Sequence, residues 1–97
     1  MTIKPGDLSA ALTSKGFRKV KGGDHDFYFY FDENGDKTKI RTKISRGSHG
    51  KKQIGESMVS IIREQMHFDK KEQLIDFVEC RLTAEDYRSM INGKNLK

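Results

Sequence analysis

The feature that most constrains this chain is a run of five consecutive aromatic residues from Phe27 to Phe31, which follows paired glycines at positions 22 and 23. Aromatic residues favour β-strands and paired glycines favour tight bends, so the pattern predicts a strand from about His25 to Asp32. Side chains alternate between the two faces of a strand. Because a phenol can keep its hydroxyl in water, Phe27, Phe29 and Phe31 are predicted to face the core, and Tyr28 and Tyr30 to face solvent.

A second strand pattern begins after Glu33-Asn34-Gly35-Asp36, where Asn-Gly is a strong hairpin signal. From Lys37 to Ile44 the alternation is strict, with Thr38, Ile40, Thr42 and Ile44 on one face and Lys37, Lys39, Arg41 and Lys43 on the other. Pairing the apolar faces sets the Phe rings beside Ile40 and Ile44. Tyr28 and Tyr30 would then lie beside the basic row, on an exposed face suited to stacking bases and binding phosphates.

The segment before these strands predicts a helix and a short strand. Lys4-Pro5-Gly6-Asp7 is typical of a helix start, with Gly6 or Asp7 as the cap, and Gly16 suits a left-handed helix end. Residues 17–21 predict a strand with Phe17 and Val20 turned towards the core and with Arg18, Lys19 and Lys21 mostly exposed.

The segment after the strands is helical by its apolar spacing. One helix is predicted from about residues 53–56 to His67, and two more follow from capping-box patterns at Asp69 with Glu72 and Thr83 with Asp86, the last ending at Asn92-Gly93. This order predicts an α+β fold: a two-layer sandwich of a helix, a three-stranded antiparallel sheet and a helix, with a C-terminal helical extension. We expect a single domain over 1–97, with a core at 5–68, the extension at 69–92 and a frayed tail at 93–97.

Charge is unevenly distributed along the 97 residues. Residues 1–52 carry 12 Lys and Arg against 6 Asp and Glu, a balance of +6, whereas residues 53–97 carry 7 against 8, a balance of −1. The cations from Lys37 to Lys52 follow one another with no acid between them. This run fits a phosphate-binding surface, and it equally fits a solvated strand face that discourages edge pairing.

Other compositional features limit the function classes. No apolar run approaches the roughly 20 residues of a membrane span, and the first residues lack the apolar segment of a signal peptide, so we expect a cytoplasmic protein with no membrane partner. The single cysteine, Cys80, has no disulfide partner in the chain and is expected to be a packed side chain. His25, His49 and His67 do not have the spacing of a metal site, so no metal or other cofactor is expected.

Several short motifs together resemble the HicA-type toxins, which are small ribonucleases of toxin–antitoxin modules. The resemblance rests on Lys15-Gly16-Phe17 at a helix end, Lys21-Gly22-Gly23-Asp24-His25, Tyr28, the basic third strand, and His49-Gly50 before Gln53-Ile54-Gly55, and it covers roughly residues 5–70. It implies a fold like the double-stranded RNA-binding domain and metal-independent cleavage of RNA with His25 as general acid or base. It also implies an acidic antitoxin that covers the basic face.

Two function classes therefore stay open at this stage. In the first, the chain is an mRNA interferase with His25 as catalytic residue; in the second, it is a non-catalytic RNA-binding or protein-interaction module, and His25 is a strand-start residue bonded to backbone. The C-terminal helices are expected to serve a homodimer or another partner. Under both, the predicted nucleic-acid-binding residues are Lys19, Lys21, Tyr28, Tyr30, Lys39, Arg41, Lys43, Arg46, His49, Lys51 and Lys52.

Overall fold

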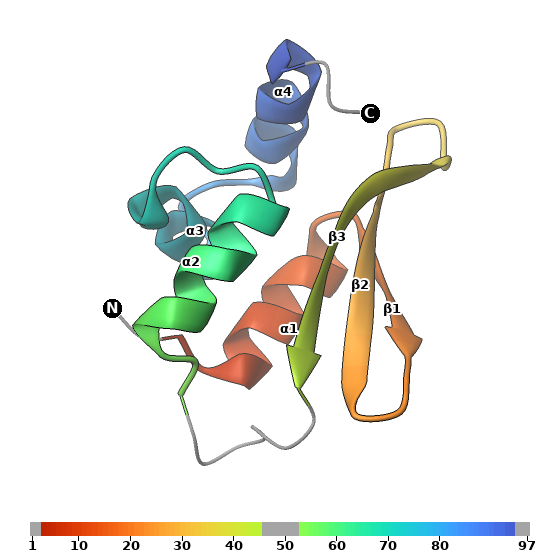
Figure 1. Cartoon of the computed structure of the whole chain (residues 1–97). Coiled ribbons are helices and arrows are strands. Elements are labelled where there is room, and N and C mark those ends of the chain that lie inside the picture. The colour runs from red at the N-terminus through yellow and green to blue at the C-terminus, as the bar shows by residue number, and fades with distance from the viewer. Residues whose placement is uncertain (1–2, 46–52, 95–97) are drawn as a thin grey trace.

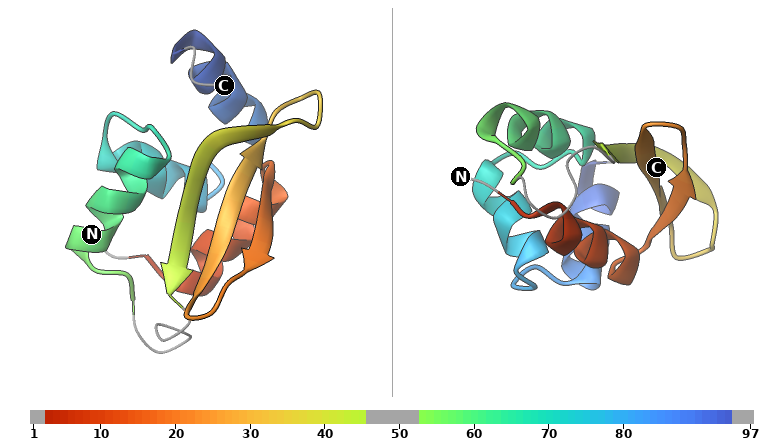
Figure 2. Two further views of the ribbon diagram at one scale, coloured as in Figure 1. Left: turned by 45° about the vertical axis from the view of Figure 1, so that its right-hand side comes forward. Right: turned by 90° about the horizontal axis from the view of Figure 1, so that it is seen from below.

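The computed structural model describes residues 3–45 and 53–94. Its elements are α1 (Pro5–Ser14), β1 (Phe17–Lys21), β2 (His25–Phe31), β3 (Lys37–Ser45), α2 (Glu56–Gln65), α3 (Lys71–Val78) and α4 (Ala84–Lys94). The strands form one antiparallel sheet in the order β1-β2-β3, and the helices gather on one side of it (Figures 1 and 2). The predicted α+β sandwich is thereby confirmed. We call the sheet face towards the helices the inner face and the opposite one the outer face.

The inner face of the sheet carries the tyrosines, so the predicted orientation of β2 is wrong. Tyr28 and Tyr30 are 2% and 3% exposed, whereas Phe27, Phe29 and Phe31 are only half-buried. The prediction assumed that a phenol needs water, but the hydroxyl of Tyr28 lies 2.7 Å from Oγ of Ser9 in α1. A buried phenol with such a partner loses little by leaving water, so its ring packs in the core.

The pairing of β2 with β3 contains an irregularity. Tyr28 lies opposite Thr42 and Phe29 opposite Arg41, whereas Phe31 lies opposite Lys37, so β3 has two extra residues in this stretch. The hydroxyl of Thr38 donates to the carbonyl oxygen of Tyr30 at 2.8 Å, which satisfies a backbone acceptor inside this irregularity. The predicted inward set Thr38, Ile40, Thr42 and Ile44 is confirmed, because all four residues are buried.

The β2–β3 turn lies where the Asn-Gly pair predicts it. The Asp32 carboxylate accepts hydrogen bonds from the backbone N–H groups of Asn34 and Asp36 at 2.9 and 3.0 Å. Gly35 has a φ of 81°, a conformation that glycine adopts without strain.

Helix α1 begins two or three residues earlier than predicted. Lys4 is the cap residue and makes no side-chain capping bond, and Pro5 takes the first turn, where its missing N–H costs nothing. Gly16 follows the helix with a φ of 100°, as its predicted capping role requires. In β1, Phe17 is buried as predicted, but Val20 is 49% exposed because it lies on the outer face beside Phe27.

Helices α3 and α4 complete the same core as the sheet and α1. Their side chains Leu74, Phe77, Tyr87 and Ile91 are all fully buried. The Tyr87 ring lies 5.7 Å from Phe17 and 5.2 Å from Tyr30, between centroids, so the last helix closes over the inner face of the sheet. Its hydroxyl donates to the carbonyl oxygen of Met66 at 2.9 Å, and burial raises the pKa of Tyr87 above its usual value.

A buried lysine ties α1 to the C-terminal helices. Nζ of Lys15, a residue only 7% exposed, donates to the carbonyl oxygens of Phe77 and Leu82, the second at 2.8 Å. The carbonyl of Phe77 belongs to the last turn of α3, where carbonyls lack partners within the helix. A cation is stabilised at such a helix end.

Helices α2 and α3 end in the same way, on a non-glycine residue in the left-handed conformation. His67 has a φ of 64° and Cys80 of 66°. In both, the next residue bonds back to the helix: Phe68 N–H to the Arg63 carbonyl and Arg81 N–H to the Asp76 carbonyl, at 3.0 and 2.8 Å. His67 therefore lies just beyond α2, not in its last turn, and Cys80 is exposed, not packed.

Of the two predicted capping boxes, one is confirmed. Thr83 N–H donates to the Asp86 carboxylate at 3.0 Å and Asp86 N–H to the Thr83 hydroxyl at 3.1 Å. These bonds lower the pKa of Asp86 below its usual value. At α3, Gln73 accepts from the N–H groups of residues 69 and 70, so the predicted pairing of Asp69 with Glu72 is wrong.

Asp69 has a different partner, at the far end of the chain. Its carboxylate accepts from Nζ of Lys94 at 2.7 Å, and this contact lowers the pKa of Asp69. Helix α4 thus runs through the predicted stop at Asn92-Gly93 and ends at Lys94.

Candidate nucleic-acid interface

The outer face of the sheet combines aromatic and cationic side chains in rows across the strands. Arg18, Phe29 and Arg41 form one row, Val20, Phe27 and Lys43 a second, and Phe31 and Lys37 a third. His25 belongs to the same face, because it precedes Phe27 by two residues on β2. Asp26 is the only acid in the three strands, and alternation turns it to the inner face. The outer face is therefore strongly cationic.

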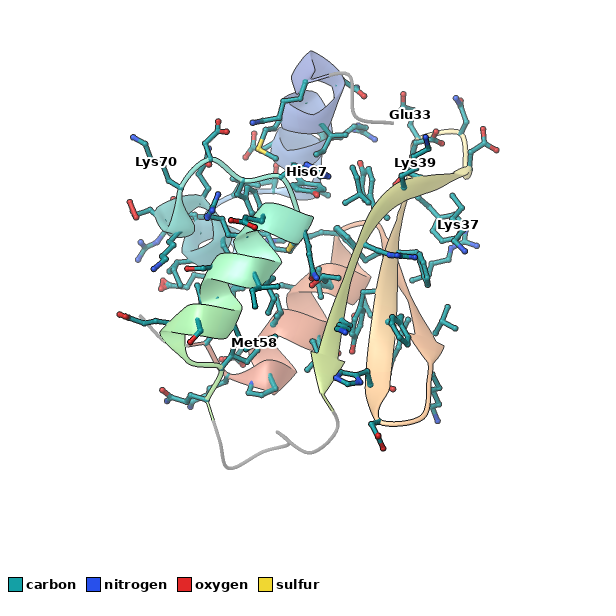
Figure 3. All side chains as sticks on the ribbon, viewed as in Figure 1. Glu33, Lys37, Lys39, Met58, His67 and Lys70 are labelled. Atoms are coloured by element: carbon teal, nitrogen blue, oxygen red, sulfur yellow. The ribbon has the colours of Figure 1, made fainter. Side chains whose placement is uncertain are left out.

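Two of the Phe rings lie beneath cations. The guanidinium carbon of Arg18 lies 4.2 Å from the ring centroid of Phe31, and Nζ of Lys37 lies 4.0 Å from that of Phe29. Cation–π contacts at exposed positions contribute about 0.5–1 kcal/mol each. They also shield apolar ring surface while the charges stay in water, which keeps an uncovered sheet face compatible with solvent. Figure 3 shows Lys37 and Lys39 on β3 near the β2–β3 turn.

His25 is positioned by the tight turn between β1 and β2. Its carbonyl oxygen accepts from Gly22 N–H at 2.9 Å, and its ring centroid lies 6.5 Å from that of Phe27. A Cβ at Gly22 would lie 2.6 Å from Cε2 of Phe27 and 2.7 Å from the His25 carbonyl oxygen, so only glycine fits. The turn thus orients both side chains. The half-buried imidazole remains accessible at the end of the outer face.

The aromatic residues of this face are the Phe residues and not the tyrosines. Tyr28 and Tyr30, predicted as base-stacking residues, are buried, so that prediction is wrong. The error has a simple origin, because the inward set of β3 was correct and the side chains of β2 were assigned one residue out of phase. This phase error excludes Phe27, Phe29 and Phe31 from the predicted site, and the prediction also omits Arg18 and Lys37, although it places both at exposed positions.

The predicted cations fall into three groups. Arg41 and Lys43 lie on the outer face, and Lys39 is exposed at the irregular stretch of β3 beside them. Lys19 and Lys21 are exposed as well, but they alternate with Arg18 and Val20 and so belong to the opposite side of β1, where Lys19 lies 3.5 Å from the Asp26 carboxylate. The predictions for Arg46, His49, Lys51 and Lys52 lie outside the described residues.

A depression lies beside β3, the edge strand of the sheet in the described part of the chain. It is lined by Phe27, Arg41, Thr42, Lys43 and Gln65. The Thr42 hydroxyl donates to Oε1 of Gln65 at 2.7 Å, which orients the side-chain amide of Gln65. No local pattern marks Gln65 as a site residue, since its position depends on how α2 packs beside β3.

The comparisons with known proteins identify no relative of this chain. No family model, curated protein or solved structure matches the chain. Within residues 3–45 and 53–94, no group of three His, Cys, Asp or Glu side chains is placed to hold a metal ion. No helix in that part of the chain has the length and apolarity needed to cross a membrane.

Proposed function

We propose that the chain binds RNA through the outer face of its sheet and cleaves it as a metal-independent endoribonuclease of the toxin class. The observation that supports this proposal is the alternation of Phe rings with Arg and Lys across the strands, with His25 at the end of the same face. Aromatic rings stack bases and cations bind phosphates without dependence on sequence. An acidic antitoxin would be attracted to the same cations, so RNA and antitoxin would compete for one surface.

The cleavage chemistry assigned to His25 is proton transfer. Its imidazole would take a proton from a ribose 2′-hydroxyl, which attacks the adjacent phosphate, or would give a proton to the departing 5′ oxygen. Lys43 lies diagonally opposite His25, since Phe27 pairs with Lys43 and His25 with Ser45. Diagonal neighbours of an antiparallel pair are about 7–8 Å apart, within the reach of a lysine side chain. Lys43 would thereby stabilise the charge that develops on the phosphate.

A non-catalytic binding module is the alternative, and one observation favours it. The backbone carbonyl of His25 is bonded to Gly22 in the turn, and its ring packs beside Phe27, so the residue has a structural role without any chemistry. The same outer face would then bind RNA or a protein and leave the RNA uncut.

Substitution of His25 separates the two functions. Because the turn bond uses the backbone of His25, His25→Ala should preserve the fold and RNA affinity. Cleavage of a labelled RNA should fall by about 100- to 10,000-fold, the usual contribution of a general acid or base. His67→Asn is the matched control, since His67 is a half-buried histidine beyond α2 and Asn tolerates its left-handed conformation. Undiminished cleavage by folded His25→Ala would refute the catalytic assignment and favour the binding module.

Charge reversal tests the RNA surface itself. A variant with Lys39, Arg41 and Lys43 changed to Glu should bind RNA much more weakly, and each lost phosphate contact should reduce the salt dependence by about one counterion. The matched control reverses Lys70, Lys71 and Arg88, which lie on or beside α3 and α4. Equal losses of affinity in both variants, with circular dichroism unchanged, would place RNA binding elsewhere.

A further inference from the structure

Phe27 differs from the other two Phe residues of the outer face. Lys37 lies over Phe29 and Arg18 over Phe31, but within the described part of the chain no Lys or Arg lies over the Phe27 ring. A base that stacked on Phe29 or Phe31 would have to displace a cation from the ring. Phe27 carries no such cost, so it is the ring of this face best suited to stack a base.

The surroundings of Phe27 supply the other groups that a nucleotide needs. Phe27 lines the depression at the β3 edge together with Arg41, Lys43 and Gln65. Arg41 and Lys43 can bind phosphate oxygens, while the Gln65 amide can reach the hydrogen-bonding edge of a base. Oε1 of Gln65 accepts from the Thr42 hydroxyl, and within residues 3–45 and 53–94 its NH₂ group has no hydrogen-bond acceptor, so it can donate to a base. An aromatic ring, two cations and an oriented amide thus converge on one small site.

The Phe27 ring is also held in place before any ligand binds. Its edge fills the space over Gly22, where a Cβ would lie 2.6 Å from Cε2 of the ring. A ring fixed in this way loses little conformational freedom when a base stacks on it, and that favours binding. The imidazole of His25, 6.5 Å away between ring centroids, lies beside the same position.

We propose that the depression at the edge of β3 binds one unpaired base of single-stranded RNA, stacked on Phe27, with its flanking phosphates on Arg41 and Lys43 and its edge facing Gln65. This inference rests on the proposed RNA-binding function and makes it specific. The stacked nucleotide lies next to His25, so the phosphate attached to it is the one exposed to the imidazole. A base within a duplex is already stacked on its neighbours and cannot enter such a site, so the pocket selects single strands.

The test compares conservative substitutions of two Phe residues in binding to a fluorescein-labelled single-stranded oligoribonucleotide. Phe27→Leu keeps an apolar side chain and removes the stacking surface, and we expect about a 5- to 150-fold loss of affinity, equivalent to one base–aromatic stack. Phe29→Leu is the comparison and should lose less affinity than Phe27→Leu, since a base that stacked on Phe29 would first have to displace Lys37. Phe27→Tyr should restore binding. A labelled duplex of the same sequence should bind both Leu variants equally.

A direct readout accompanies the affinities. Photocrosslinking of an oligoribonucleotide that contains 4-thiouridine, followed by mass spectrometry, should give a crosslink at Phe27 and none at Phe29. Equal affinity of folded Phe27→Leu and the parent chain, or a crosslink only at other residues, would overturn the proposal. That result would leave the wider RNA-binding function standing if the charge reversal at Lys39, Arg41 and Lys43 still weakened binding. Failure of the parent chain to bind any RNA would refute both.

Discussion

Lys15 allows a quantitative test of how the C-terminal helices are attached to the rest of the molecule. Its Nζ donates to the carbonyl oxygens of Phe77 and Leu82 and lies 4.7 Å from the centroid of the Phe77 ring. In Lys15→Met the apolar stem still fills its space, but both carbonyls lose their bond from Nζ, and the Phe77 carbonyl is left with the Cys80 N–H at 3.4 Å. A hydrogen bond to a charged group contributes about 1.5–3 kcal/mol. The net loss should be about 2–4 kcal/mol, because burying the lysine charge itself carries a desolvation cost in the parent protein.

Urea denaturation followed by circular dichroism measures this loss directly. For a domain of this size, the expected change corresponds to a fall in Tm of roughly 10–30 °C. Lys70→Met is the matched control, because Lys70 is exposed and its substitution should change the free energy of unfolding by less than about 0.5 kcal/mol. A Lys15→Met protein within that same margin of the parent would show that the two carbonyl contacts do not stabilise the fold.

Three further predictions concern the backbone and the helix caps. Cys80→Gly should raise the free energy of unfolding by about 0.5–1 kcal/mol in urea denaturation, since glycine adopts the left-handed conformation without strain, while Cys80→Ala should give no gain. Gly22→Ala should lower Tm strongly, whereas at Gly23, where a Cβ meets nothing within 4 Å, the same change should have little effect in the same thermal melt. The hydrogen bonds to Thr83 lower the pKa of Asp86 in the folded protein below its pKa in the unfolded chain. The stability that Asp86 contributes is therefore fully present above the unfolded pKa, and it is lost as the pH falls through the folded pKa. Asp86→Asn should therefore make stability less dependent on pH below about 4, and an unchanged acid-unfolding profile would contradict this.

The fold could be predicted from sequence because its signals are local. The Asn34-Gly35 turn, the alternation in residues 37–44 and Gly16 after α1 each specify a short stretch of backbone, and all three are observed. The orientation of β2 could not be predicted in the same way. Five aromatics in a row have no apolar periodicity, so the choice of face depends on partners distant in sequence, such as Ser9 for the Tyr28 hydroxyl.

The candidate site was predicted only in part for the same reason. Arg41 and Lys43 were found because they alternate with buried Ile40 and Ile44 within one strand. Arg18 reaches the site through pairing of β1 with β2, and Gln65 through packing of α2 beside β3. Local sequence patterns predict neither of these contacts, so both residues can be assigned to the site only from the folded structure.

The closure of the core by α4 has a consequence for the order in which the chain can fold during its synthesis. Phe17 and Tyr30 leave the ribosome early, but the ring that packs against both belongs to Tyr87, near the C-terminus. Until α4 has emerged, Phe17 and Tyr30 lack the Tyr87 ring that covers their part of the inner face. The core of this domain can therefore close only after Tyr87 has been synthesised, so the sheet that carries the outer face gains its last packing contacts late in folding.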